Sequence, residues 1–149
     1  MRFWDSSAIV PLAVEEDQSD EVRALLDEDN DLAVWWATSL ECRSAIARGA
    51  REGALTREAR RRALSLLDRI FDAAVEVAPS PLLRARAARL IDRHPLRSAD
   101  ALQLAATEIL FEGLAGRGDV MGGELVCLDE RLRRAAEQEG YPVVPAWGG

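Results

Sequence analysis

The feature that most constrains the fold of this chain is an alternation of short apolar runs with longer amphipathic segments. Five runs are rich in apolar and β-branched residues, as is typical of strands, and cover residues 2–4, 31–36, 73–78, 124–128 and 142–146. Apolar residues recur with the period of a helix in six other segments, which cover residues 19–27, 38–52, 56–72, 80–93, 98–112 and 130–139. This order predicts an α/β protein.

The residues that flank the predicted helices support these boundaries. Ser80 followed by Pro81 is typical of an N-cap and a first helical turn. We expect Gly113 and Gly140 to follow helix ends, because glycine is favoured just after the last helical residue. Pro95 is expected to end the helix before it.

The connections between the strands predict how the elements are layered. Strands that alternate with helices share a parallel sheet, and right-handed crossovers place helices on its faces. Two helices lie in each of the middle connections, so we expect a helix-rich, three-layer α/β/α arrangement around a parallel sheet of four to five strands. Residues 113–124 contain five glycines and no periodicity, which predicts a mobile loop before the fourth strand.

Length and composition favour one domain that covers residues 1–149, with enough apolar residues for a continuous core. No stretch approaches the ~18 apolar residues of a membrane span, and Asp5 interrupts the start, so neither a membrane segment nor a secretory signal is expected. We therefore expect a cytoplasmic protein. Cys42 and Cys127 lie far apart in apolar segments without CxxC spacing, which predicts two reduced core thiols.

The charge of the chain restricts how it could meet a nucleic acid. The net charge is -7, and all 19 basic residues are arginine. A nucleic-acid binder of the usual kind presents a broad basic face, and the acidic net charge of this chain argues against such a face. An acidic protein can still handle phosphate if its carboxylates hold a divalent metal and a few arginines line the approach.

Four acids lie just past a predicted strand or in the first turn of a predicted helix. Asp5 and Asp129 each follow an apolar run, while Glu41 and Asp100 lie near the starts of two helices. Strand ends and the helix starts that follow them meet at the carboxyl edge of a parallel sheet. The four side chains are therefore expected to converge, although they are far apart in the sequence.

Each acid also has a structural interpretation that the sequence leaves open. Asp5 and Asp129 fit N-caps, residues 38–41 fit a capping box, and Asp100, two residues after a capping Ser98, fits a response to the helix dipole. Carboxylates embedded in apolar segments nevertheless need a partner. Several of them together raise one another's pKa, and a hard cation such as Mg²⁺ or Mn²⁺ relieves that repulsion.

The segments around the four acids carry a resemblance to a known family. WDSSAIVPL, ATSLECRSAIAR, LRSADALQLAAT and VCLDERLRRAA resemble, in order and spacing, the four acidic motifs of PIN domains and particularly of the VapC-type toxins of bacterial toxin–antitoxin pairs. The resemblance covers essentially the whole chain. It implies a PIN-like fold, a Mg²⁺ or Mn²⁺ requirement, endonuclease action on RNA and a small cognate antitoxin.

The resemblance also implies roles for individual residues. Asp5, Glu41 and Asp100 would be the core metal ligands, and Asp129 would complete the pocket or bind the metal through water. Ser7 matches a small polar residue often found beside the first acid, but a helix-capping hydroxyl explains it equally well.

Arginines near the motifs are candidate substrate contacts. Arg43, Arg97 and Arg131 could grip RNA phosphates, for which the planar guanidinium is suited. Salt bridges with nearby acids are the alternative for each of them. The run 60–62 consists of arginines and is interpreted as the solvated side of a helix that could contribute to an RNA path.

The histidine and the tryptophans are interpreted mainly as structural residues. The chain has one histidine, His94, so a two-histidine ribonuclease mechanism is not available to it. Because His94 stands before a proline at a helix end, it is expected to be a C-terminal helix feature. Trp4, Trp35 and Trp36 lie on predicted strands and are expected in the core. Trp147 is the candidate for a surface contact.

Other functions have less support. A receiver domain would need a lysine at its acidic site, and the chain has none. A haloacid-dehalogenase-type phosphotransferase would show a second Asp where Ser7 stands, and no nucleotide-binding glycine loop is present. The serious alternative is a catalytically weak PIN-like module that binds a partner through its acidic cleft. A homodimer is also expected, mainly from the resemblance and from apolar surface on residues 56–72.

Overall fold

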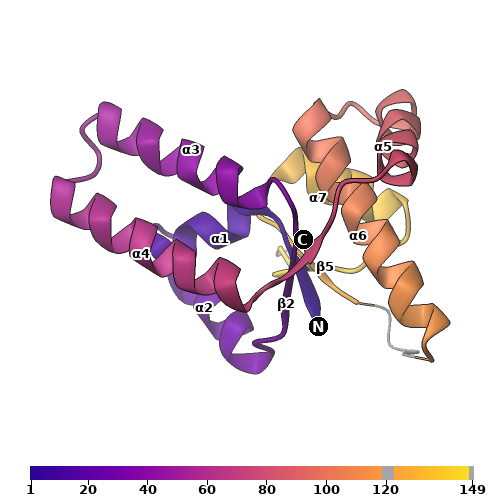
Figure 1. Ribbon diagram of the computed structural model, residues 1–149, viewed down its shortest axis with the longest axis horizontal. Coiled ribbons are helices and arrows are strands. Elements are labelled where there is room, and N and C mark those ends of the chain that lie inside the picture. The colour runs from indigo at the N-terminus through magenta and orange to yellow at the C-terminus, as the bar shows by residue number, and fades with distance from the viewer. Residues whose placement is uncertain (119–122, 148–149) are drawn as a thin grey trace.

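The computed structural model describes residues 1–118 and 123–147, and these form a parallel sheet between two layers of helices (Figure 1). The sheet order is β3-β2-β1-β4-β5, and every neighbouring pair is parallel. The chain moves outward from β1 through β2 to β3 and then returns to β4 on the other side of β1. Such a switch point opens a crevice outside the carboxyl ends of β1 and β4. The strands are β1 (Arg2–Trp4), β2 (Leu32–Trp35), β3 (Val75–Val77), β4 (Leu125–Val126) and β5 (Val143–Val144).

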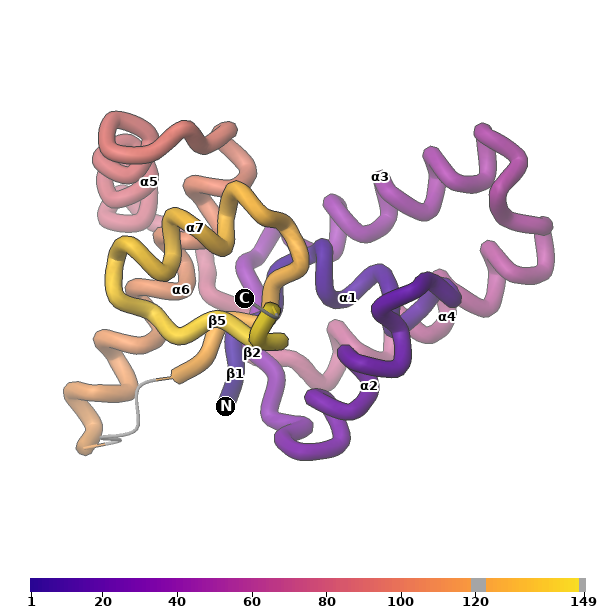
Figure 2. The backbone as a smooth tube through the Cα atoms, turned by 180° about the vertical axis from the view of Figure 1, so that it is seen from behind, coloured from indigo at the N-terminus to yellow at the C-terminus, as the bar shows by residue number. Residues whose placement is uncertain are grey.

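The helices divide between the two faces of the sheet. Figures 1 and 2 show α1 to α4 on one side of the strands and α5 to α7 on the other. Phe3 and Trp4 are fully buried in different core clusters, because successive side chains of a strand point to opposite faces. The helices are α1 (Ser6–Ala13), α2 (Ser19–Glu28), α3 (Thr38–Arg51), α4 (Arg57–Ala73), α5 (Pro81–Arg93), α6 (Ser98–Gly116) and α7 (Glu130–Gln138).

Most helix boundary signals are confirmed. The Ser80 hydroxyl accepts the backbone N–H of Leu83 at 3.1 Å, and Pro81 is the first residue of α5. Pro95 follows the end of that helix, and Gly140, with φ 93°, follows the end of α7 in the left-handed region. The five predicted strands are also present; β1 matches its apolar run, and the other four are shorter than theirs.

Helix α1 is not among the six helical segments predicted from the periodicity, although the interpretation of Asp5 as an N-cap allowed a helix at this place. The segment is only eight residues long and contains Pro11, so its periodicity is weak. One local and one tertiary feature stabilise it. Asp5 caps its first turn, and Ala8, Ile9 and Leu12 are buried in the core.

The helix predicted over residues 98–112 was expected to end before Gly113, which is wrong, because α6 continues to Gly116. Leu114 packs against the core and carries the helix through Gly113. The left-handed turn falls instead at Gly118, with φ 85°. The loop predicted over residues 113–124 is therefore shorter, and its residues 119–122 lie outside the described part of the chain.

The other structural predictions have a mixed outcome. Cys42 and Cys127 are buried free thiols, and Trp4 and Trp35 lie in the core, as predicted. Trp36 was predicted wrongly: it follows the last residue of β2 and is 52% exposed. Trp147 is exposed, as expected, and so are the arginines at 60–62 on α4. None of the described helices is long and apolar enough to span a bilayer.

Candidate functional site

The four acids singled out in the sequence line one depression of about 280 Å³ at the carboxyl edge of the sheet. Asp5 comes from the β1–α1 junction, Glu41 from α3, Asp100 from α6 and Asp129 from the residue before α7. The predicted convergence is therefore confirmed. Glu16, in the connection between α1 and α2, lines the same depression and was missed, because a loop carries no periodicity that would place it.

Asp5 is the most deeply buried of these acids, with 5% of its surface exposed. Its Oδ2 accepts the backbone N–H of Ser7 at 3.0 Å, so it does cap α1. Burial raises the pKa of the Asp5 carboxyl, the bonds from Ser7 lower it, and the charges of Asp129 and Asp100 raise it further. Although Asp5 caps the helix, its ionised form is therefore disfavoured beside the neighbouring acids.

Ser7 connects the two central strands at this edge. Its hydroxyl donates to Asp5 Oδ2 at 2.5 Å and accepts the backbone N–H of Leu128 at 2.9 Å. Leu128 follows β4 and precedes Asp129, so Ser7 holds two acid-bearing junctions together. Ser7 lines the depression, but its hydroxyl does not cap α1, because Asp5 is the cap and the hydroxyl accepts the N–H of Leu128 instead.

Glu41 does not form the capping box predicted for residues 38–41. Ala37 occupies the N-cap position, and the side chains of Thr38 and Glu41 face Gln103 on α6 instead. Burial raises the pKa of Glu41 from its ordinary 4.5 to about 7; the hydrogen bond from Gln103 opposes this, and the charges of Asp5 and Asp100 add to it. The carboxylate is therefore bound across the site rather than within its own helix.

Asp100 and Asp129 each accept one backbone N–H at a helix start. Asp100 Oδ2 accepts that of Arg97 at 3.2 Å, so Arg97 rather than the expected Ser98 is the N-cap residue of α6. Asp129 Oδ1 accepts that of Leu132 at 2.9 Å and caps α7, as its structural interpretation predicted. Burial and the charge of Asp129 raise the pKa of Asp100, while the hydrogen bond from the Arg97 backbone opposes them.

The acids provide the right kind of donor for a hard cation. All four offer carboxylate oxygens, the ligands that Mg²⁺ and Mn²⁺ prefer, and the negative charges of three of them raise neighbouring pKa values. Within residues 1–118 and 123–147, however, no three acid, histidine or cysteine side chains already form a metal-binding group. Each acid instead accepts a hydrogen bond from the protein, which it would exchange or share on binding a cation.

The three candidate arginines lie in different surroundings. Arg43 pairs with Asp68 on α4, as its salt-bridge interpretation predicted. It lines neither the depression with the four acids nor the one described next. Arg97 and Arg131 line a second depression of about 580 Å³, whose wall includes Asp100 and Asp129. The two depressions therefore adjoin along these two acids. Arg134 lines the second one and was not predicted.

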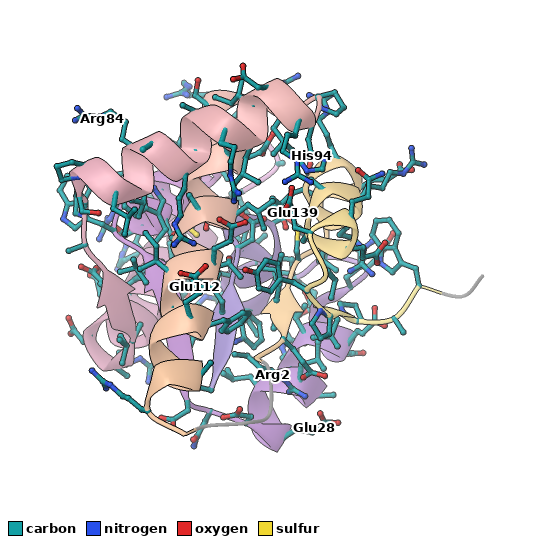
Figure 3. The ribbon with its side chains drawn as sticks, turned by 90° about the vertical axis from the view of Figure 1, so that its right-hand side faces the viewer. Arg2, Glu28, Arg84, His94, Glu112 and Glu139 are labelled. Carbon is teal, nitrogen blue, oxygen red and sulfur yellow. The ribbon has the colours of Figure 1, made fainter. Side chains whose placement is uncertain are left out.

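His94 lies at the C-terminal end of α5, as predicted. It follows the last residue of α5, is buried, and its Nε2 lies 2.7 Å from Glu139 Oε1. Figure 3 shows the two side chains facing each other between α5 and the end of α7. This contact ties the two helices together, and His94 also lines the second depression.

Gln103 is the most informative residue that sequence reasoning missed. It lies in α6 with 1% of its surface exposed and donates hydrogen bonds toward α3. The signal that could have found it is a polar side chain inside the apolar segment SADALQLAA, because a buried amide needs a partner.

Similar proteins are found by fold and not by sequence. No protein-family model and no curated protein matches the chain. A chain of a toxin–antitoxin complex from Klebsiella pneumoniae has a TM-score of 0.63 at 15% identity, with 97% of each chain covered. PAE2754 from Pyrobaculum aerophilum has a TM-score of 0.61 at 21% identity, covering 96% of this chain and 83% of that one. FitAcB from Neisseria gonorrhoeae has a TM-score of 0.59 at 16% identity, with 96% of each chain covered.

These likenesses extend along nearly the whole chain, and at such identities they concern the fold. The predicted PIN-like α/β/α arrangement is confirmed, with a parallel sheet of five strands. The fold is shared with a chain from a toxin–antitoxin complex.

Proposed function

We propose that this chain is an endoribonuclease that depends on Mg²⁺ or Mn²⁺ and is the toxin of a toxin–antitoxin pair. One observation carries the proposal: acids from four separate segments line a single depression at the switch point of the sheet. Capping explains Asp5, Asp100 and Asp129 one by one, but it does not explain Glu41 and gives no reason for four acids to gather in spite of their repulsion. The fold shared with a toxin–antitoxin chain supports the toxin assignment.

In this proposal Asp5, Glu41 and Asp100 hold the cation, and Asp129 binds it directly or through water. When bound, the cation supplies Lewis-acid activation of the scissile phosphate and of a water. The water oxygen forms the new bond to phosphorus, the bond to the 3′ oxygen breaks, and that oxygen takes up a proton. The products carry a 5′-phosphate and a 3′-hydroxyl.

We place the RNA backbone on the second depression, beside the acids. Arg97 and Arg131 line it, and its wall includes Asp100 and Asp129, so a strand held there would pass the proposed metal centre. Because the chain as a whole is acidic, binding of RNA phosphates would depend largely on this local arginine pair. Arg43 is a weaker candidate, because it is paired with Asp68.

Cleavage of a transcript pool with Mg²⁺, Mn²⁺ or EDTA tests the function. We expect cuts with either metal and none in EDTA, with end chemistry as stated above. Asp5→Asn and Asp100→Asn should abolish cleavage without unfolding the chain, because an amide oxygen can still accept each capping N–H. Asp92→Asn, an exposed position on α5, is the matched control. Cleavage that survives both site variants would refute the proposal.

The substrate class needs its own comparison. One similar structure is that of FitAB bound to an IR36 DNA fragment, at 17% identity and a TM-score of 0.61. DNA of the same sequence should therefore be tested beside the RNA. Metal-dependent cleavage of DNA but not of RNA would replace the substrate in this proposal.

We also propose a small antitoxin as partner, action in the cytoplasm and assembly as a homodimer. A small gene beside this one, whose product co-purifies with the chain and suppresses cleavage, is the expected result. The absence of any small companion gene would count against the toxin assignment. Sedimentation of the purified chain tests the dimer.

A binding module without strong catalysis remains the second candidate. It is favoured by the hydrogen bond that each acid accepts from the protein and by the lack of a ready metal-binding group within the described residues. Metal-dependent cleavage separates the two functions, since a binding module would hold its partner equally well in EDTA.

A further inference from the structure

A buried polar bridge joins helices α3 and α6 beside the acidic depression. Gln103 lies one turn after Asp100 on α6 and is 1% exposed. Its Nε2 donates to Thr38 Oγ1 at 3.0 Å and to Glu41 Oε2 at 2.6 Å. The same amide nitrogen therefore contacts the first residue of α3 and the acid that α3 contributes to the site.

Core stability alone does not explain a glutamine at this position. Its Oε1 is buried and has no hydrogen-bond partner among the described residues. An unsatisfied buried acceptor is unfavourable, and an apolar side chain of similar size would avoid it. The advantage of the amide must lie in what its N–H groups hold.

We infer that Gln103 is a positioning residue that holds the Glu41 carboxylate in place for a divalent cation. This inference rests on the proposed metal-dependent function. The bond from Gln103 engages Oε2 of Glu41, and a carboxylate has a second oxygen that can bind a metal. Because Gln103 and Asp100 share one helix, the bridge also fixes the position of Glu41 relative to Asp100. Hydrogen bonds to ligating carboxylates orient them in this way in metal sites.

Gln103→Leu tests the role, because leucine fills a similar volume and donates nothing. Mn²⁺ affinity, measured from the electron paramagnetic resonance signal of free Mn²⁺, should fall about 10- to 100-fold. The melting temperature in EDTA should change little, since removal of the unsatisfied Oε1 offsets the loss of the donor to the buried Thr38 hydroxyl. Gln103→Met is the second variant if the leucine variant does not fold.

Two controls separate positioning from a general effect on packing. Thr38→Val removes the other hydrogen bond of Gln103 and leaves its bond to Glu41, so Mn²⁺ affinity should stay within about threefold of wild type. Thr107→Val changes a buried hydroxyl on the same helix, which bonds the Gln103 backbone carbonyl and not an acid, and should also leave the affinity unchanged.

A double-mutant cycle gives the decisive result. If Gln103 acts through Glu41, then Gln103→Leu should change Mn²⁺ affinity less than twofold in a Glu41→Gln background. An equal loss in both backgrounds, or wild-type affinity in Gln103→Leu, would overturn the inference and leave the proposed function standing. A wild-type chain that binds no Mn²⁺ would refute both. Normal Mn²⁺ binding that depends on Gln103, without RNA cleavage, would support the inference and refute only the nuclease.

Discussion

Replacing Glu41 by glutamine should make the folded chain more stable at alkaline pH and should leave its stability in acid unchanged. Burial, together with the charges of Asp5 and Asp100, raises the pKa of Glu41 from 4.5 to about 7. The folded state therefore keeps a proton at this site at pH values where the unfolded chain has lost it. The contribution of Glu41 to the free energy of unfolding is fully present below pH 4.5 and is lost as the pH rises through about 7. A glutamine cannot ionise, so the variant lacks this loss.

The pKa change fixes an upper limit for the effect. A rise from 4.5 to about 7 corresponds to roughly 3 kcal/mol against the ionised form. The Glu41 carboxylate is only partly buried, so solvent screening reduces this to about 1 to 2 kcal/mol. The amide oxygen of the substituted side chain can still accept the hydrogen bond from Gln103, so the packing of α3 against α6 should persist.

Urea unfolding in EDTA, followed by tryptophan fluorescence at about pH 4.5 and pH 8, measures the effect. Glu41→Gln should match wild type in acid and exceed it by about 1 to 2 kcal/mol at pH 8. Glu76→Gln, on the exposed face of strand β3, is the matched control and should follow wild type at both pH values. A variant that gains nothing at pH 8, or gains equally at both pH values, would refute the electrostatic reasoning.

Three further predictions concern substrate contacts and stability. Arg97→Gln/Arg131→Gln, made in an Asp5→Asn background, should reduce the steepness of log K against log salt for single-stranded RNA by about 1.4. Changing two of the arginines at 60–62 in the same background is the control and should reduce the slope much less. Arg133→Ala should cost about 2 to 4 kcal/mol in urea unfolding, because its guanidinium binds the buried carbonyls of Cys127 and Pro145; a loss under about 1 kcal/mol would contradict this. Gly113→Ala should raise the melting temperature, since the position has open space and lies within α6, whereas Gly140→Ala should lower it because of its φ of 93°.

The convergence of the acids was predictable because topology forces it. In a parallel sheet every strand ends at the same edge, and an acid just past a strand is placed there whatever the side chains around it. Asp5 and Asp129 follow adjacent strands on the two sides of the switch point. Their positions required only the correct order of strands and helices.

The contacts of Glu41 were not predictable in the same way. A capping box is a local pattern, and the sequence at 38–41 fits one, but a buried amide from α6 competes for the same carboxylate. Whether Glu41 accepts from the backbone of its own helix or from Gln103 depends on how closely α3 and α6 approach. That distance is set by the packing of the whole core. Helix α1 was missed for a related reason, since burial of Ile9 and Leu12 stabilises a segment whose own sequence is a weak helix former.

Capping and metal binding are compatible roles for these acids, although the sequence presents them as alternatives. The bond that caps α1 involves Oδ2 of Asp5, and the bond that caps α7 involves Oδ1 of Asp129. A carboxylate has a second oxygen, so a cap can hold the side chain at the carboxyl edge and still leave a ligand for a cation. The helix start that a capping acid serves also carries partial positive charge, which disfavours a cation nearby. Several acids are then needed to outweigh it, which is a physical reason for a metal site beside helix starts to gather more than two carboxylates.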